Sequence, residues 1–403
     1  MLKTEDLYNS PNRLAPYYSS FNVSERLLLT GHSHQAWPDC GFEGQKKAWL
    51  DAADFVDDKW EKAFAKADAV KKGYLKLLDD NTGNISLSSN THDMIIRFLS
   101  ALPLDKRRKL ITTDGEFHTI RRQLNRLSEE GIEIKKVASS PIDDVIENLI
   151  ACVDNNTAAV LVSKVFFNSG EILNNLSTLM QKCEEHGTQL LIDAYHALNV
   201  VPFSVKNEKL ESAFIVGGGY KYCQLGEGNC FLRFPANTTL RPVITGWYSE
   251  YEALSSAKKK GETLYGKGDA LFAGATYDPT SHYRGAEVFN FFNEQKLTPE
   301  FLRKVSQHQI SLLITGFDKG DFDQRIITRN KNIPVDRIGG FLVLYTPYAS
   351  EISGRLKKEG VWTDYRADRL RLGPAPYLSD NQLINSMNIL THVVNKLNLP
   401  YKR

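Results

Sequence analysis

Cysteine is scarce and scattered in this sequence, and long apolar runs are missing. The five cysteines are odd in number and show neither a disulfide framework nor the spacing of a metal ribbon. This pattern predicts a protein of the reducing cytoplasm. No apolar stretch approaches the roughly 20 residues that a membrane-spanning helix needs. Residues 1–18 mix charge, proline and tyrosine without an apolar core, so no signal peptide is expected.

An excess of one charge is also missing. Fifty lysines and arginines against 48 acidic residues give a formal net charge of +2, which offers no reason to expect nucleic acid or an anionic membrane as a partner. No metal is expected either, because His32 and His34 have no second ligand pair at useful spacing. What remains is an ordinary globular composition, with 42% hydrophobic residues in a chain of 403. A chain of this length predicts about two domains.

Short apolar runs alternate with helical patterns between about residues 109 and 235. Helices are predicted over Pro141–Cys152 and over Leu173–His186, where Gly187 follows as a C-cap. This alternation predicts a mainly parallel sheet covered by helices on both faces. The predicted strands are Lys109–Thr113, Ala158–Val165, Gln189–Ala194, Ala213–Val216 and Cys230–Phe234.

The last hundred residues have a different pattern. A helix is predicted over Leu297–Phe317, a strand over Gly339–Tyr345 and a long amphipathic helix over Ser379–Leu397. These elements predict a smaller α+β domain. We therefore expect three parts: an N-terminal segment that packs on the small domain and the active site, a large domain and a small domain, at residues 1–60, 61–296 and 297–403.

An acidic residue ends one of the predicted strands. Leu191 and Ile192 lead into Asp193, and in open α/β sheets the carboxyl ends of the strands face the ligand crevice. A carboxylate largely removed from water at such a place needs a cationic partner or several hydrogen bonds. A helix cap or a turn is the alternative interpretation of Asp193 taken by itself.

A lysine follows the next predicted strand, in the run Gly217-Gly218-Gly219-Tyr220-Lys221-Tyr222. Three glycines let the backbone turn sharply and let a bulky ligand approach closely. A lysine amine forms Schiff bases with carbonyl cofactors, and burial lowers its pKa for that task. The alternative is an ordinary hairpin with a lysine that reaches into solvent.

The two residues together are more informative than either alone. Pyridoxal phosphate needs a Schiff-base lysine and an acid that keeps its pyridine nitrogen protonated, and Lys221 and Asp193 supply both. Residues 88–91 precede a predicted helix over His92–Leu102 and offer hydroxyls and free N–H groups for the phosphate, or else a simple helix cap. Phe117 offers an aromatic face for the ring, or else belongs to the core. The sequence therefore predicts pyridoxal 5'-phosphate as cofactor.

These motifs resemble those of the fold-type I pyridoxal-phosphate enzymes in the class V aminotransferase group, and most of all the kynureninases. The resemblance runs from about Leu28 to Pro376. It implies an aspartate aminotransferase-like α/β fold, with a mainly parallel seven-stranded sheet between helices and a smaller α+β C-terminal domain. The matching motifs are Asp193-Ala194-Tyr195-His196-Ala197, Tyr220-Lys221-Tyr222, Gly226-Glu227-Gly228, Gly246-Trp247 and Arg371-Leu372-Gly373-Pro374-Ala375-Pro376.

The resemblance implies a role for each matched residue. Lys221, Asp193 and Tyr220 would be catalytic, and Arg371 would bind the substrate α-carboxylate. The alternative for Arg371 is a surface ion pair with Asp364 or Asp368. Trp247 would reach the phosphate from the second subunit of a homodimer. Further cofactor contacts are implied for Asn90, Thr91, Phe117, Ser163 and His196, and substrate contacts for Ser33, His34 and Asp278.

The sequence departs from the kynureninase pattern at three places. Gly31-His32-Ser33-His34-Gln35 stands where those enzymes have Gly-Asn-Ser-Leu-Gly. Ile120 stands where they have an aspartate three residues after the stacking Phe, and Asp278 where they have an asparagine before a proline. The first and third changes concern the substrate end, so Asp278 suggests a cationic or polar substrate as a further hypothesis.

The resemblance implies an enzyme that acts on a small α-amino acid through an external aldimine, with Lys221 as general base at Cα. Hydrolysis of the Cβ–Cγ bond of kynurenine or a related amino acid is the expected outcome. The alternatives are a class V aminotransferase that produces a keto acid and a non-catalytic binding protein with the same fold. A cysteine desulfurase is disfavoured, because its nucleophile lies on a C-terminal loop and every cysteine here lies at or before Cys230.

Overall fold

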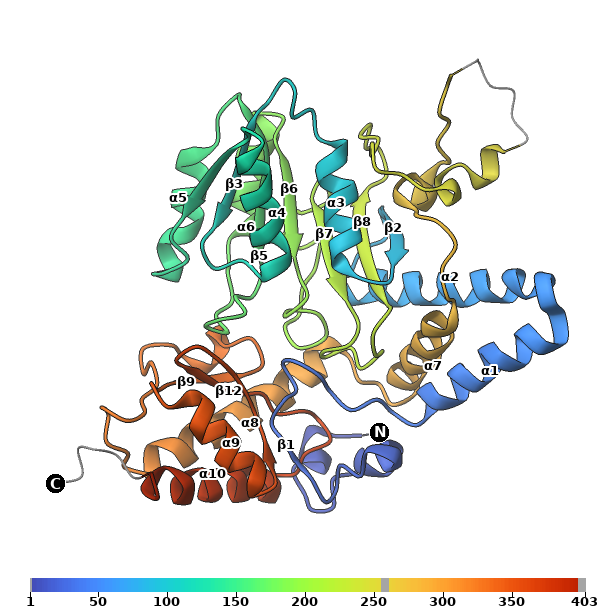
Figure 1. Cartoon of the computed structure of the whole chain (residues 1–403). Helices are drawn as coiled ribbons and strands as arrows, with labels where there is room; N and C mark the ends of the chain where they lie inside the picture. Colours follow the sequence, from blue (N-terminus) through green and yellow to red (C-terminus); the bar gives the residue numbers. More distant parts are fainter. Residues whose placement is uncertain (1, 255–260, 398–403) are drawn as a thin grey trace.

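The computed structural model of the chain describes residues 2–254 and 261–397 (Figure 1). The first residue of the predicted 1–60 segment and residues 398–403 of the predicted small domain lie outside this range. Figure 1 shows a larger α/β part above a smaller part formed by the C-terminal hundred residues.

A seven-stranded sheet organises the larger part. Its spatial order is β2-β8-β7-β6-β5-β3-β4. The strands run parallel except β8, which is antiparallel to both of its neighbours. The mainly parallel seven-stranded sheet is thus confirmed. The strands are β2 (Gly83–Ser88), β3 (Lys109–Thr113), β4 (Glu133–Val137), β5 (Thr157–Ser163), β6 (Gln189–Asp193), β7 (Phe214–Gly218) and β8 (Cys230–Pro235).

The five strands that the sequence predicts are confirmed, whereas β2 and β4 were not predicted. Both missed strands lie at the edges of the sheet. Most of β4 is exposed and two of its five residues are lysines, and β2 is only half buried. An edge strand faces less of the core, so its sequence lacks the apolar run that marks a central strand.

Helices cover both faces of this sheet. On one face α3 (Thr91–Ala101) and α4 (His118–Glu129) share a core with Leu161 of β5. On the other face α2, α5 and α6 share a core with Val160 and Val162 of the same strand. Successive side chains of a strand point to opposite faces, so every residue of β5 is buried. These three helices are α2 (Lys59–Leu77), α5 (Val145–Cys152) and α6 (Leu176–Glu185).

Two further helices, α1 (Cys40–Phe55) and α7 (Thr280–Glu294), pack beside the sheet at the edge that carries β2 (Figure 1). Their backbones approach closely at Gly44. A Cβ atom there would lie 2.7 Å from the carbonyl oxygen of Tyr283. Glycine is therefore required by the helix contact, because the backbone of α7 cannot shift cheaply.

Within residues 297–397 the smaller part contains three α-helices and a three-stranded antiparallel sheet in the order β11-β12-β9. The two predicted helices and the predicted strand of this region are confirmed, with boundaries shifted by at most three residues. The elements are α8 (Pro299–Lys319), β9 (Leu342–Tyr345), α9 (Ala349–Lys358), β11 (Asp364–Arg366), β12 (Arg369–Leu372) and α10 (Asp380–Asn395).

The N-terminal segment packs against this smaller part. Its short strand β1 (Leu27–Leu28) pairs in parallel with β10 (Val361–Trp362). The ring of Tyr8 stacks on His308 of α8 with 3.7 Å between the centroids, and Asn12 donates a hydrogen bond of 2.9 Å to the Pro376 carbonyl. The exact division of the chain into three domains stays a prediction.

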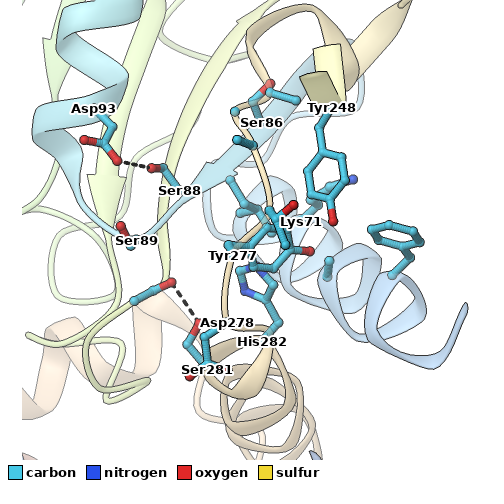
Figure 2. Close-up of a pocket in the computed structure, with 18 of the residues that line it drawn as sticks. Lys71, Ser86, Ser88, Ser89, Asp93, Tyr248, Tyr277, Asp278, Ser281 and His282 are labelled. Atoms are coloured by element: carbon cyan, nitrogen blue, oxygen red, sulfur yellow. Dashed lines mark hydrogen bonds between the residues drawn. The ribbon is translucent and has the colours of Figure 1, made fainter. Parts of the chain in front are cut away.

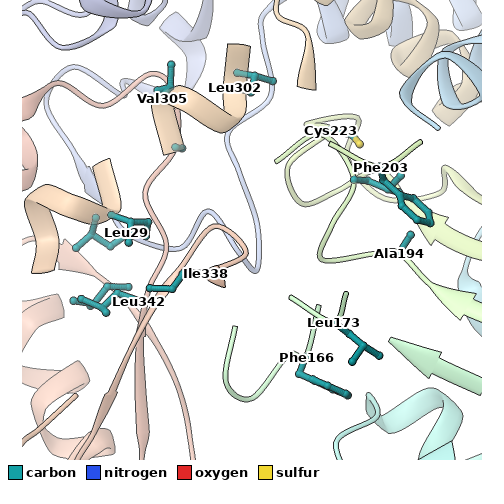
Figure 3. Close-up of a cluster of buried hydrophobic side chains, with 14 of the residues drawn as sticks. Leu29, Phe166, Leu173, Ala194, Phe203, Cys223, Leu302, Val305, Ile338 and Leu342 are labelled. Carbon is teal, nitrogen blue, oxygen red and sulfur yellow. The ribbon is translucent and has the colours of Figure 1, made fainter. Parts of the chain in front are cut away.

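One apolar cluster joins the two parts of the molecule. Figure 3 shows Leu302 and Val305 of α8 and Leu342 of β9, together with Phe166 and Ala194 of the larger part. This shared core sets the smaller part against the carboxyl ends of the parallel strands. No helix in residues 2–254 and 261–397 is long and apolar enough to cross a membrane.

Candidate active site

A cavity of about 380 Å³ lies where the parallel strands end. Its size falls within the roughly 300–1,000 Å³ of small-molecule sites. Four separate chain segments meet here: the starts of α3 and α4, the end of β6 and the loop after β7. The lining residues are Ser89, Asn90, Thr91, His92, Phe117, Thr119, Asp193, Tyr195, His196, Tyr220, Lys221, Glu227, Gly228 and Cys230.

Lys221 projects its amine into an enclosed, largely aromatic space. Only 6% of the residue is exposed, and its Nζ lies 2.7 Å from Nε2 of His196. The ring centroids of Tyr195, Phe117 and Tyr220 lie 4.9, 5.6 and 5.8 Å from Nζ. These surroundings exclude the alternative of a lysine that reaches into solvent.

Asp193, the last residue of β6, is the acid that faces this amine. One of its oxygens accepts a hydrogen bond of 2.9 Å from the backbone N–H of Tyr195. Burial raises the pKa of Asp193 and lowers the pKa of Lys221 to about 7, and attraction between the two charges opposes both shifts. The cavity therefore holds an amine that is partly neutral near pH 7 beside a buried carboxyl.

The N-terminus of α3 forms a second wall of the cavity. Asn90 is its N-cap, and its Oδ1 accepts a hydrogen bond of 2.9 Å from the N–H of Asp93. Thr91 begins the helix, and the remaining N–H groups of the first turn point out of the helix end. Such an end attracts anions through its donors and its dipole.

The three glycines before Lys221 serve a purpose that the sequence did not reveal. None of them has a positive φ, so they do not make the sharp turn that we expected. A Cβ on Gly218 would lie 2.5 Å from both Sγ of Cys230 and the hydroxyl of Tyr195, and one on Gly219 would lie 2.7 Å from Leu225. The glycines make room for neighbouring protein side chains that close the cavity.

Ser163 ends β5 next to Asp193, but it does not line the cavity. Its hydroxyl donates a hydrogen bond of 2.5 Å to Oε2 of Glu116. This contact could not be predicted from the sequence, because Glu116 lies in a polar run before Phe117. Ile120, the second departure from the kynureninase pattern, packs in the core between α4 and the sheet.

Arg371 of β12 lies in the wall between the two parts of the molecule, with 3% of its surface exposed. Its Nη1 donates a hydrogen bond of 2.7 Å to the Phe167 carbonyl, and its Nη2 binds Asp364. Asp364 also accepts a bond of 2.6 Å from Arg366, and Nε2 of His32 lies 3.6 Å away. The ion pair with Asp364 is thus present, but it is buried instead of lying at the surface.

The predicted substrate residues of the N-terminal loop lie beside the cavity and are absent from its lining. The hydroxyl of Ser33 donates to the Thr30 carbonyl at 3.0 Å, and His34 stacks on Tyr220 with centroids 4.8 Å apart. His32 is fully buried, and neither ring nitrogen has a hydrogen-bond partner among the described residues. Burial lowers the pKa of His32 to about 4, so its imidazole is neutral.

Asp278 lies in a neighbouring cleft of about 1,000 Å³ instead (Figure 2), and Trp247 lies in neither cavity lining. Asp278 lines that cleft, and its Oδ1 accepts a hydrogen bond of 2.9 Å from the N–H of Thr280 at the start of α7. Trp247 is 45% exposed, next to Tyr248 of the cleft wall, and its indole N–H donates to Thr276 at 3.1 Å. The cleft meets the smaller cavity at Ser89, Glu227 and Gly228.

Several lining residues were not predicted, namely His92, Thr119, Tyr195 and Cys230. Tyr195 lies inside the motif around Asp193, and Cys230 opens a predicted strand, so position relative to the motifs was the available signal. Burial raises the pKa of Cys230 to about 12, which makes it a thiol and a poor nucleophile. The cavity therefore offers an amine, a carboxyl, an aromatic face and an anion-binding helix end, which together fit pyridoxal phosphate.

Comparisons with known proteins agree with this geometry. No protein-family model matches the chain. The chain is 23% identical over 328 residues to a kynureninase of Bacillus cereus and 25% identical over 334 residues to a kynureninase of Geobacillus thermodenitrificans. Each alignment covers 77% of this chain and 72% of the relative.

Solved structures share the fold across nearly the whole chain. A cysteine desulfurase of Thermococcus onnurineus has a TM-score of 0.79 at 14% identity, covering 98% of this chain and 99% of its own. A cystine C–S lyase, solved with its product cysteine persulfide, has a TM-score of 0.77 at 15% identity, covering 94% and 99%. At such identities these structures establish the fold alone.

Fold, cavity and sequence relatives together define the class of protein. The chain is a fold-type I enzyme that depends on pyridoxal 5'-phosphate. Within that class it is kynureninase-like in sequence.

Proposed function

We propose that the protein is a hydrolase of kynureninase type, which breaks the Cβ–Cγ bond of kynurenine or of a related amino acid. One observation carries the proposal: Lys221, Asp193 and His196 meet in one buried cavity of a chain whose curated relatives are kynureninases. The products would be alanine and an aromatic acid.

Four residues would hold the cofactor. Asn90 and Thr91 would hold its phosphate at the positive end of α3, and Phe117 would lie against its ring. Asp193 would hold a proton on the pyridine nitrogen. Pyridoxal phosphate, when bound, supplies an electron sink for the α-carbon of an amino acid.

Lys221 would do the chemistry that falls to the protein. An amine with a pKa near 7 is neutral often enough to bond to a carbonyl carbon, and once the amino group of the substrate has displaced it from that carbon, its free Nζ could accept the proton from Cα. His196 lies 2.7 Å from that Nζ and orients it. Burial and the charge of Lys221 keep the pKa of His196 well below its usual value, so the imidazole is neutral.

Arg371 would bind the α-carboxylate of the substrate. Two of its terminal nitrogens are held by Phe167 and Asp364, which fixes the plane of the guanidinium. Its Nε–H has no hydrogen-bond partner among the described residues, so a donor remains for a ligand. Tyr220 would also be catalytic, because its ring lies next to both the amine of Lys221 and the ring of His34.

Aminotransferase activity is the second candidate function, because that reaction would use every residue named so far. What favours it is the departure from the kynureninase pattern at His32, which lies fully buried 3.6 Å from Asp364 beside the proposed carboxylate site. Asp278 supports neither candidate, since its carboxylate caps α7 in the neighbouring cleft. The desulfurase alternative loses further support from the buried thiol of Cys230.

A homodimer is part of the proposal. Trp247 is exposed, and its neighbour Tyr248 lines the cleft of about 1,000 Å³. A second copy that covers this cleft would bring its own Trp247 toward the phosphate site of the first. Sedimentation of wild type and of Trp247→Ala would show whether the assembly exists and depends on this residue.

The absorbance spectrum of the purified protein tests the function. We expect a visible band from the lysine-bound cofactor that Lys221→Ala lacks, and alanine with an aromatic acid when L-kynurenine or 3-hydroxykynurenine is added. A keto acid as product would establish the aminotransferase instead. Wild-type protein that shows no band in excess pyridoxal phosphate would overturn the proposed function and favour a non-catalytic protein.

A further inference from the structure

Glu116 is a buried acid behind the cavity that the mechanism above does not use. It lies between β3 and α4, directly before Phe117, and 2% of its surface is exposed. Its Oε1 accepts hydrogen bonds from Oγ1 of Thr113 at 2.7 Å and from the N–H of Ser163 at 3.3 Å. Its Oε2 accepts the bond of 2.5 Å from the Ser163 hydroxyl. Three donors thus fix this carboxyl group at the ends of β3 and β5.

No cation in the described part of the chain balances Glu116. Within the described part of the chain, no lysine, arginine or histidine forms an ion pair with it. The titratable group that faces it is Asp193 from β6, whereas Thr113 and Ser163, from β3 and β5, carry no charge. Burial raises the pKa of Glu116 to about 7; the hydrogen bonds from Ser163 and Thr113 oppose the rise, and repulsion from Asp193 adds to it.

Glu116 and Asp193 form an unequal pair of acids. Ser163 lies between them, because it pairs with Asp193 in the register of β5 and β6 and donates its hydroxyl to Glu116. Asp193 has a cation nearby in Lys221, and Glu116 has none. When two carboxyls interact in a buried site, a proton they share resides on the one with less positive charge around it. That acid is Glu116.

We propose that Glu116 is a positioning residue which carries a proton in the cofactor-free protein and releases it when a protonated pyridine nitrogen binds to Asp193. The inference rests on the role of Asp193 in the proposed function. A cation at Asp193 cancels the repulsion that disfavours the ionised form of Glu116. Its O–H bond then breaks, the proton passes to water, and three donors remain to hold the carboxylate.

A purely structural role for Glu116 makes different predictions. Glutamine has the same shape and keeps a hydrogen bond to Ser163, but it cannot lose a proton. If Glu116 only holds the loop in place, stability and cofactor binding will depend on pH in Glu116→Gln as they do in wild type. Comparing wild type with this variant therefore separates the effect of the proton from the effect of side-chain packing.

The first test measures unfolding by urea between pH 4 and pH 8, without cofactor. Because the folded pKa of about 7 lies above the usual 4.5 of glutamate, the stability that Glu116 adds is present at low pH and is lost as pH rises toward 7. The stability of wild type relative to Glu116→Gln should therefore fall across this range. A constant difference would overturn the proposal. Glu133→Gln removes an exposed carboxylate from β4 and controls for the loss of one charge.

The second test measures binding of pyridoxal phosphate from pH 6 to pH 8. The affinity of wild type relative to Glu116→Gln should rise with pH, by about tenfold for each unit that binding lowers the pKa of Glu116. A ratio that does not change with pH would overturn the coupling. Asp193→Asn separates the two proposals: if it binds the cofactor as tightly as wild type, the role of Asp193 is wrong, and the coupling falls with it. The stability test would still report whether Glu116 carries the proton.

Discussion

Asp364 and Arg371 are directly opposite each other in the antiparallel pairing of β11 and β12, and their side chains form a buried ion pair. The arginine also donates to the Phe167 carbonyl of the larger part. The guanidinium is therefore held from both sides of the junction before any substrate arrives. Holding a charged donor in place in advance lowers the cost of binding a carboxylate.

Asp364→Asn should destabilise the protein by about 3 kcal/mol at neutral pH, because it leaves the buried charge of Arg371 without its counter-ion. Burial alone would raise the pKa of Asp364, but the charges of Arg371 and Arg366 hold it well below its usual value. The stability gained from the ionised Asp364 is thus present above about pH 4 and is lost on further acidification. Urea unfolding should show the full difference between wild type and variant at pH 7 and a smaller but still measurable difference at pH 3, because the folded pKa of Asp364 lies well below 3.8.

Arg371→Lys should weaken the binding of amino acids to the loaded enzyme by about tenfold to a hundredfold, because a lysine cannot reproduce the planar, two-point contact of a guanidinium. The amino-acid concentration that gives half of the spectral change measures this effect. Cofactor affinity should stay close to that of wild type, since Arg371 does not line the cavity. An unchanged half-saturation would show that the carboxylate binds elsewhere.

The rate at which pyridoxal phosphate attaches to the protein should rise with pH through about 7 and then level off. The neutral amine of Lys221 is the reactive form, and burial lowers its pKa to about 7 while Asp193 opposes the shift. In Asp193→Asn this opposing attraction is lost, so the profile should move to lower pH. Rapid-mixing absorbance records both profiles. A midpoint in wild type near 10.5, the usual value for lysine, would contradict the burial seen here.

Gly218→Ala should cost about 1–3 kcal/mol of stability, because its methyl group would overlap Cys230 and Tyr195 at 2.5 Å. Gly354→Ala is the matched control. That glycine lies inside α9 with no heavy atom within 4 Å of the added Cβ, so alanine should stabilise the helix by about 0.5–1 kcal/mol. Thermal unfolding compares the two, and equal stabilities would show that the strand end has more room than its contacts indicate.

Much of the fold could be predicted because buried strands carry their own signal. The runs over residues 158–162 and 190–192 are apolar on both faces, which is typical of the centre of a covered parallel sheet. The reversed direction of β8 could not be predicted, since Cys230–Pro235 has the same apolar pattern as the strands that run parallel to one another. Strand direction depends on the path of the connecting chain and leaves no mark on composition.

Part of the candidate site could likewise be predicted from the sequence, and part could not. Lys221 and Asp193 were predictable because Asp193 ends one strand and Lys221 follows the next, and the ends of parallel strands meet at one edge of the sheet. Glu116 was not predictable as a site residue, because nothing in its sequence neighbourhood indicates that it is buried beside Asp193. The contact depends on the order of β3, β5 and β6, which pairing between distant segments decides.

The sequence by itself determined the class of the protein, since the lysine, the acid and the glycine run are local patterns tied to strand ends. Tertiary structure alone decided the electrostatics of the site. The pKa of Lys221 near 7, the counter-ion of Arg371 and the proton on Glu116 all arise from burial and from charges brought together from remote segments. Desolvation and Coulomb forces depend on distances through space, and a linear sequence does not contain those distances.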